Sequence, residues 1–246
     1  MPRPVLAASA LLVIGAAGEA RGDLRSFTQT YEYSTVPQGR TAVELWHTQG
    51  RSTWDKDTAQ TIQHIVELEH GITDHWDIAL YNVFEQTAGG GAVMAEPYHY
   101  SETKLETRYR FANRGEWPVD TLVYLELAKE FGESLYEIEG KVIGARDFGD
   151  LTVAANAIVE VKLGNDAAET EPEFGWALGA TYQLHPKVRA GAETWGAAEE
   201  GEVELSIGPA VSLAPASNFW VTVTAGFGLT DEADAFSARA IIGIEL

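Results

Sequence analysis

Cysteine is absent from the sequence, and basic residues are scarce among its 246 residues. Without cysteine the chain cannot form a disulfide scaffold, a thiol nucleophile, a cysteine-ligated zinc site or a lipoprotein anchor. Lys and Arg number 17 against 37 Asp and Glu, which gives a net charge of −20. A nucleic-acid partner is therefore excluded, because phosphate binding needs a concentrated basic face. Disorder is excluded as well, since 45% of the residues are hydrophobic.

Long hydrophobic runs are missing after residue 22. Before that point Arg3 precedes an apolar stretch from Val5 to Ala17, and small residues follow at Ala20 and Gly22. This pattern is typical of a cleaved secretory signal peptide, and the stretch is too short to span a bilayer. We therefore predict a signal peptide over residues 1–22 and an exported protein.

Alternation of apolar and polar residues, by contrast, runs through almost all of the remaining chain. Phe219, Val221 and Val223 share one face of a predicted strand, for example, whereas Thr222 and Thr224 share the other. Alternation over about ten residues is long for a strand of a soluble protein. The pattern predicts about twelve long strands in one all-β domain over residues 23–246. The strands are expected at 41–48, 61–70, 76–85, 98–111, 119–130, 134–145, 151–162, 173–184, 188–196, 203–213, 218–229 and 236–246.

The connections between these strands fall into two interleaved sets. One set is compact: 36–39, 71–75, 112–118, 146–150, 185–187 and 214–218. The other is often longer and more polar: 49–59, 86–97, 131–134, 163–172, 197–201 and 230–235. Short turns that alternate with longer loops distinguish the periplasmic end of a bacterial outer-membrane barrel from its external end. Pro209 lies inside a predicted strand and indicates a bulge.

The composition of the polar face indicates which face points outward. In the last five strands this face consists mostly of Gly, Ala, Ser and Thr, which suit a confined lumen better than a surface in water. The apolar face should then contact lipid, and its aromatic residues near strand ends resemble the girdles of a membrane barrel. These aromatic residues are Trp76, Phe84, Tyr109, Phe111, Phe174, Phe219 and Phe236. The alternative is a secreted soluble β-sandwich or barrel with the apolar face inside.

Taken together, these features resemble a Gram-negative outer-membrane β-barrel protein of the porin-like or transporter-like kind. The final segment, ARAIIGIEL at 238–246, places Ala240, Ile242, Ile244 and Leu246 on one face. Such proteins usually end on a terminal aromatic residue, and this chain departs from them by ending on leucine. The resemblance implies an antiparallel up-and-down transmembrane barrel in the cell outer membrane. Its implied partners are outer-membrane lipids, lipopolysaccharide and, during biogenesis, the barrel-assembly machinery.

Strand parity bears on the segment before the first predicted strand. Bacterial barrels nearly always have an even strand number, yet residues 27–34 alternate as well, with Phe27, Tyr31 and Tyr33 on one face. We expect the segment 23–40 to pair only partly, to lie in the lumen or to sit at the periplasmic mouth. A fourteen-stranded barrel with an extra strand in 86–97 is the alternative.

Charged residues gather on the polar face of the first half of the chain. The candidate wall comprises Glu44, Glu67, Glu69, Lys104, Glu106, Arg108, Arg110, Glu126, Glu137, Glu139 and Lys141. Arg108 and Arg110 are placed to meet Glu67, Glu69, Glu137 or Glu139. As a channel wall for small solutes, this surface would favour cations, because its carboxylates are in excess. The alternative is a plugged, non-conducting lumen in which the ion pairs neutralise one another.

No catalytic, cofactor or metal site stands out. His99 and Ser101 lie two residues apart, as a lipid-active outer-membrane enzyme could place them, but no flanking motif accompanies them. His70 and His75 flank a turn without a clear third metal ligand. We therefore predict a channel or transporter without a cofactor. The alternative is a non-conducting barrel with a structural, adhesive or lipid-hydrolysing role.

Overall fold

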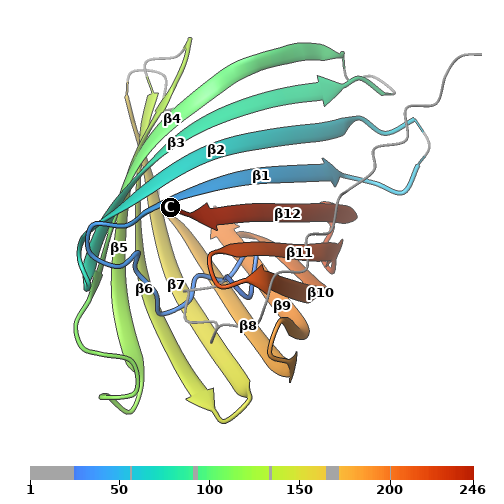
Figure 1. The fold of residues 1–246 in the computed structure, drawn as a ribbon. Helices are drawn as coiled ribbons and strands as arrows, with labels where there is room; N and C mark the ends of the chain where they lie inside the picture. The colour runs from blue at the N-terminus through green and yellow to red at the C-terminus, as the bar shows by residue number, and fades with distance from the viewer. Residues whose placement is uncertain (1–24, 56, 91–93, 133–134, 165–171, 200) are drawn as a thin grey trace, which may run out of the picture.

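The computed structural model describes residues 25–246, except 56, 91–93, 133–134, 165–171 and 200. The predicted signal peptide at 1–22 lies outside the described residues. Twelve antiparallel strands form a closed barrel (Figure 1), as the alternation predicts. They are β1 (Thr41–Arg51), β2 (Gln60–Thr73), β3 (Trp76–Ala88), β4 (Glu96–Arg110), β5 (Asp120–Glu130), β6 (Leu135–Phe148), β7 (Leu151–Gly164), β8 (Glu173–His185), β9 (Val188–Glu199), β10 (Glu202–Ala216), β11 (Phe219–Gly228) and β12 (Phe236–Glu245).

Each strand pairs with its neighbours in the sequence, and β1 pairs with β12 to close the barrel. The closing ladder is regular from Ala42 opposite Glu245 to Arg51 opposite Phe236. Closure matters physically because it leaves no strand edge with unpaired backbone groups. The fourteen-stranded alternative is wrong: between the end of β3 at Ala88 and the start of β4 at Glu96, the described residues contain no further strand and only one isolated bridge residue, Gly90. Among the described residues, no helix is long and apolar enough to cross a membrane.

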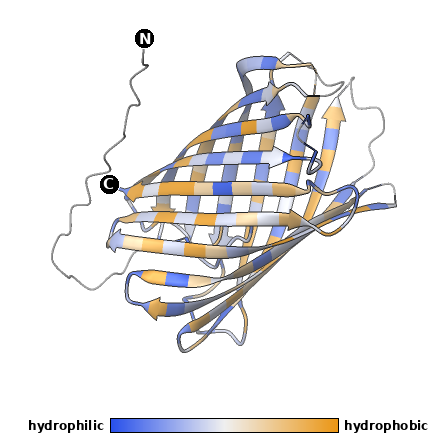
Figure 2. Ribbon diagram, turned by 90° about the vertical axis from the view of Figure 1, so that its right-hand side faces the viewer, coloured by the Kyte–Doolittle hydropathy of each residue, from blue (hydrophilic) through white to orange (hydrophobic). Residues whose placement is uncertain are grey.

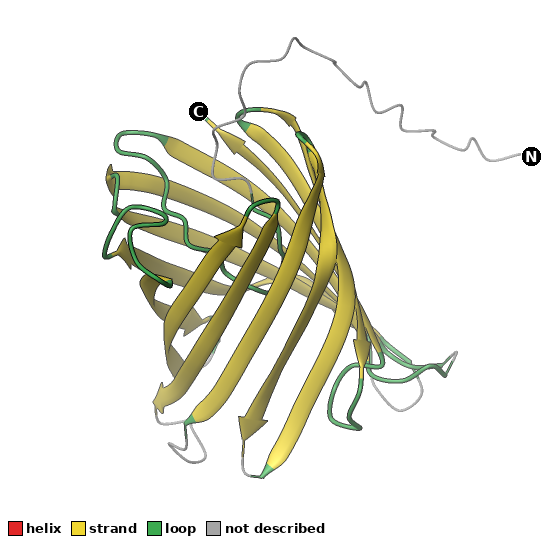
Figure 3. Ribbon diagram, turned by 90° about the horizontal axis from the view of Figure 1, so that it is seen from below, coloured by secondary structure: helices red, strands yellow, loops and turns green. Residues whose placement is uncertain are grey.

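The two ends of the barrel differ in their connections (Figure 3). We call one the termini end, because β1 begins there and β12 ends there. Four of its turns are two residues long, and in one of them Gly149 adopts a φ of 66°, which a tight hairpin turn requires and glycine adopts without strain. The exception is the connection 111–119. We call the opposite end the loop end; its β9–β10 connection is shorter than expected, because both strands extend further.

The apolar face points outward, as the polar-face composition predicts. Val223 is 43% exposed, whereas the neighbouring Thr222 is fully buried inside the barrel. The same alternation of hydrophobic and hydrophilic residues follows the strands in Figure 2. Aromatic residues gather on the outside at both ends: Phe111 stacks on Trp117 at the termini end, and Phe84 stacks on Tyr98 nearer the loop end. The soluble alternative, which needs the apolar face inside, is therefore wrong.

The segment 25–40 forms no strand; residues 25–36 lie inside the barrel (Figure 1), whereas residues 37–40 are exposed just before β1. Its only ladder contact is a single parallel bridge between Gln38 and Gly71. Phe27 and Tyr33 are fully buried and belong to one apolar cluster with Ile143 of the barrel wall. Despite its alternation, then, the segment is held by side chains of the wall and not by a partner strand. We call it the N-terminal segment below.

The small residues in the second half of the barrel have a structural role, and one expectation about this half needs correction. A Cβ on Gly179 would lie 2.5 Å from the ring of Phe27, so the glycine makes room for the N-terminal segment. The bulge expected at Pro209 is absent, because the pairing of β10 with β11 keeps one register from Ile207 to Ala210. Pro209 lies within a regular strand and lacks only one ladder donor.

Candidate functional site in the barrel lumen

The charged wall expected from the sequence lies on the inner face of β1, β2, β4, β5 and β6. Six of its members are buried: Glu44, Glu67, Glu69, Glu106, Arg108 and Glu126. The other five are partly buried: Lys104, Arg110, Glu137, Glu139 and Lys141. The side chains are drawn to one surface because alternate residues of a strand share a face, and the tilted strands bring these faces together inside the barrel.

Arg108 is the centre of the most buried part of this wall. Its guanidinium donates to both carboxylate oxygens of Asp77, at 3.1 and 2.7 Å, and also to Glu69. Its Nε lies 3.1 Å from Glu106 Oε1. Three carboxylates thus share one guanidinium. Of the carboxylates expected to meet Arg108, only Glu69 does so.

Arg110 does not meet any of the four expected carboxylates. It donates instead to Thr35 Oγ1 at 2.7 Å and to the backbone carbonyl of Asp74. Its guanidinium also lies over the ring of Tyr33, 5.5 Å from the centroid. The expectation was wrong because it considered only strand residues, whereas Arg110 faces the N-terminal segment.

The lysines of the wall are paired within it. Lys104 Nζ lies 3.3 Å from Glu102 and 3.2 Å from Glu126. Lys141 Nζ lies 2.9 Å from Glu139 and 4.2 Å from the ring centroid of Tyr124. Both cations are therefore neutralised locally and add little net positive charge to the lumen.

A row of directly opposed carboxylates crosses five consecutive strands. In order from β4 to β8, the paired residues are Glu106, Glu126, Glu139, Glu160 and Glu173. Like charges placed directly opposite one another on a sheet are destabilising. Glu106 is buried in mid-barrel, whereas Glu173 is the first residue of β8 at the loop end. The row, which we call the carboxylate row, therefore runs from the loop end into the interior.

A cavity of about 400 Å³ lies between the carboxylate row and the N-terminal segment. Glu160 and Glu173 line it, and neither forms a salt bridge among the described residues. Tyr31 and Trp46 also contribute to the lining. A smaller recess of about 150 Å³ continues the acidic surface at the loop end, where Glu204 lines both spaces. The cavity is thus acidic near the loop end and aromatic at greater depth.

Glu193 holds the N-terminal segment against the opposite wall. Its carboxylate accepts three consecutive backbone N–H groups, from Thr28 at 2.9 Å, Gln29 at 2.8 Å and Thr30 at 2.7 Å. The hydroxyl of Thr224 donates to the same carboxylate at 2.5 Å. Such charge-assisted bonds are stronger than neutral ones. Glu193 therefore fixes the backbone of this part of the segment.

A second polar anchor lies on β7. The side chain of Asn156 accepts the backbone N–H of Tyr31 at 2.7 Å and donates to its carbonyl oxygen at 2.9 Å. Further along the segment, the backbone N–H of Val36 donates to Asp77 at 2.8 Å. The buried backbone of the segment is thus satisfied by side chains, in place of the ladder that a strand would have.

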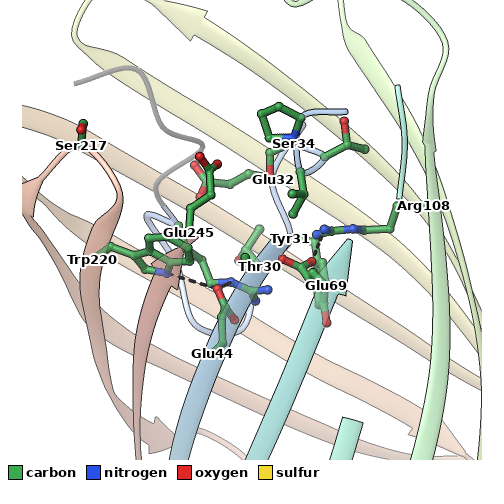
Figure 4. A pocket seen from close by; sticks show the side chains of 15 residues that line it. Thr30, Tyr31, Glu32, Ser34, Glu44, Glu69, Arg108, Ser217, Trp220 and Glu245 are labelled. Atoms are coloured by element: carbon green, nitrogen blue, oxygen red, sulfur yellow. Dashed lines mark hydrogen bonds and ion pairs between the residues drawn. The ribbon is translucent and has the colours of Figure 1, made fainter. Parts of the chain in front are cut away.

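Arg25 begins the described part of the N-terminal segment and lies between acidic and aromatic side chains. Its Nε lies 3.3 Å from Glu44 Oε1, and its guanidinium lies over the rings of Trp46, at 4.7 Å, and Tyr31, at 5.1 Å. Glu44 in turn accepts the indole N–H of Trp46 at 2.8 Å. It also accepts the indole N–H of Trp220 at 3.1 Å (Figure 4). Burial lowers the pKa of Arg25, but the carboxylates raise it by more, so its pKa lies well above the usual value.

Several of these lumen residues were not singled out from the sequence. They are Arg25, Trp46, Asp77, Glu102, Asn156, Glu160, Glu173 and Glu193. For the acidic residues the signal was present, since Glu160 and Glu193 occupy the polar face of alternating strands. No sequence signal identifies Arg25, because its partners lie on strands far along the chain.

The histidines considered as possible catalytic or metal-binding residues show no catalytic arrangement. The ring of His99 contacts the carbonyl oxygen of Pro97, and the buried hydroxyl of Ser101 has no hydrogen-bond partner among the described residues. His70 contacts Thr41, and His75 contacts Asn113. In the described part of the chain, no group of three or more His, Asp or Glu side chains is arranged to hold a metal ion.

Comparison with known proteins gives structural but not sequence relatives. No family model matches the chain, and no curated protein matches its sequence. Its fold is similar to that of the COG4313 outer membrane channel from Pseudomonas putida F1, with a TM-score of 0.73 at 10% identity, over 89% of this chain and 100% of that one.

Two porins are similar over most of the chain as well. KdgM porin in complex with disordered oligogalacturonate gives a TM-score of 0.56 at 11% identity, over 83% of this chain and 97% of that one. NanC porin gives 0.55 at 10% identity, over 84% and 100%. At these identities the likeness concerns the fold. The chain therefore has the fold of an outer-membrane β-barrel.

Proposed function

We propose that the protein is a porin-like channel for small polar solutes in the outer membrane, with the termini end in the periplasm. The observation that carries this proposal is the polar cavity of about 400 Å³ inside a closed barrel with an apolar exterior. An apolar outer band suits lipid, and a polar interior suits water and solutes. The fold shared with an outer membrane channel and two porins supports the same conclusion.

The lumen is narrowed by the N-terminal segment, which lies across it and is bonded to β3, β7 and β9. We therefore expect small conductance steps and exclusion of larger solutes. This same feature favours a second candidate function, a non-conducting barrel whose lumen the segment closes. Ser101 and His99, the pair considered for an enzymatic role, form no hydrogen bond with each other.

Planar-bilayer recordings of the refolded, full-length mature chain separate the two candidates. A channel gives discrete, reproducible current steps in symmetrical KCl, whereas a heat-denatured sample of the same preparation gives none. The second candidate replaces the first if the folded protein inserts, as judged by its heat-dependent gel mobility, and yet carries no current. Release of sugars of increasing size from liposomes then measures the width of the pathway.

A further inference from the structure

The surroundings of Arg25 have the chemistry of a binding site for an organic cation. Glu44 supplies a carboxylate, and Trp46 and Tyr31 supply the faces of two aromatic rings. Aromatic faces attract cations most strongly when water is excluded, and a planar guanidinium pairs well with carboxylates. In the structure the side chain of Arg25 occupies this arrangement.

Arg25 does not satisfy every carboxylate around it, because Glu67 is left without a hydrogen bond in the described part of the chain. The Glu67 side chain is fully buried, and neither of its carboxylate oxygens has a hydrogen-bond partner among the described residues. It lies directly opposite Glu44 in the pairing of β1 with β2 and attracts Arg25 electrostatically. A buried carboxylate without a hydrogen bond is costly. A free guanidinium, which is not tethered to the backbone as Arg25 is, can place donors on Glu67 as well as on Glu44 and would therefore bind more favourably here.

The position of this group in the lumen makes it accessible to a solute. Tyr31 and Trp46 line the cavity of about 400 Å³ that opens toward the loop end. Arg25, Tyr31 and Glu44 also line a small space of about 40 Å³ on the other side of the N-terminal segment (Figure 4). Tyr31 lines both spaces, whereas Arg25 lines the smaller one. A solute that descends along the carboxylate row meets the aromatic rings first.

We propose that Glu44, Glu67, Trp46 and Tyr31 form a binding site for small guanidinium compounds, in which Arg25 is the resident occupant. A free guanidinium ion competes with Arg25, places its planar donors between the two carboxylates and stacks on Trp46. This inference deepens the proposed channel function by naming a class of solute. Its test measures binding and not conduction, however, so its outcome does not depend on whether the barrel conducts.

The test measures equilibrium binding to the refolded, full-length mature chain in detergent by titration calorimetry. The probe is methylguanidinium, and methylurea is its uncharged isostere. Arg25→Ala empties the site, and we expect it to bind methylguanidinium at least about tenfold more tightly than the wild type. Arg40→Ala is the matched control, because it removes an arginine of the same segment from an exposed ion pair with Glu245. It should bind as the wild type does.

Two further variants assign the binding to the proposed residues. Adding Glu67→Gln or Trp46→Leu to Arg25→Ala should remove the gain, and methylurea should bind none of the chains. The proposal is overturned if folded Arg25→Ala binds methylguanidinium no better than Arg40→Ala, or binds methylurea equally well. If Arg25→Ala does not fold, the wild type decides: it must prefer methylguanidinium to methylurea, and equal binding overturns the proposal.

The outcome is distinguishable from failure of the channel proposal. If the barrel binds methylguanidinium but carries no current, the binding site is supported and the channel proposal fails. If the barrel conducts but fails the binding test, the channel is supported and the binding-site proposal fails.

Discussion

At the scale of single residues, one carboxylate does much to keep the N-terminal segment inside the barrel. Glu193 accepts three backbone N–H groups that would otherwise be buried without partners. A glutamine of the same shape would retain an acceptor oxygen but would lose the charge and would present a donor to one of these groups. The segment should therefore respond to this change more than the barrel itself does.

We accordingly predict that Glu193→Gln loosens the segment. Hydrogen bonds to a charged group contribute about 1.5–3 kcal/mol each, so losing one raises the population of the displaced segment roughly ten- to a hundredfold. The expected result is a higher conductance or more frequent opening in bilayer recordings. Glu204→Gln, on the cavity lining, is the control and should leave the opening frequency unchanged. Identical traces for Glu193→Gln and the wild type would contradict the anchoring role.

Gly179 offers a steric test of the same contact. A Cβ added there would lie 2.5–2.8 Å from ring atoms of Phe27, which is too close for both to stay in place. Gly179→Ala should cost about 1–3 kcal/mol through overpacking and should expose the segment to added protease. Gly140→Ala is the control, since its Cβ would meet Val159 at an ordinary 3.8 Å. Equal proteolysis of the two variants would show that Phe27 is not held by this contact.

At the scale of strands, the same substitution should have opposite consequences on the two faces. Val223→Arg places a charge on the lipid-facing side of β11 and should cost about 2–4 kcal/mol near the bilayer midplane. Ala197→Arg places the same side chain in the acidic cavity of the lumen, beside Glu173 and Glu204. We expect Val223→Arg to lower folding yield in lipid, read from heat-dependent gel mobility, and Ala197→Arg to fold normally. Equal losses would contradict the assignment of faces.

Period-two alternation is enough to predict strands and their faces, because one face of each strand contacts lipid and the other contacts the lumen. This is why the exposure of Val223 and the burial of Thr222 followed from their positions alone. The same reasoning could not place residues 27–34, which alternate but form no strand. Their position depends on wall residues such as Glu193, which lies 165 residues from Thr28 in the sequence. A local sequence pattern cannot predict contacts between residues so far apart in the chain.

At the scale of the whole molecule, negative charge dominates both the chain and the lumen. The net charge is −20, and the lysines of the wall are already paired with glutamates. Glu160, Glu173 and Glu204 line the cavity without salt bridges among the described residues. In a narrow lumen with low-dielectric walls, this excess attracts cations and repels anions.

We therefore predict a preference for K⁺ over Cl⁻ in reversal-potential measurements across a salt gradient. The double variant Glu160→Gln/Glu173→Gln should reduce the preference, because it removes two unpaired charges from the pathway. Glu116→Gln, in the connection 111–119 outside the lumen, should leave the preference unchanged. A clear preference for anions in the wild type would contradict the assignment of the carboxylate row to the conducting pathway.

The contacts of the N-terminal segment also determine the order in which the barrel can be assembled. The first residues of the described chain are held by residues that are synthesised last: the carbonyl oxygen of Arg25 accepts from Thr222, 197 residues later, and Thr28 donates to Glu193. None of these bonds can form until β9 and β11 exist. Meanwhile, β1, which follows the segment directly, must still pair with β12. The segment therefore stays without these partners until the second half of the barrel has formed, so its docking is a late step of assembly.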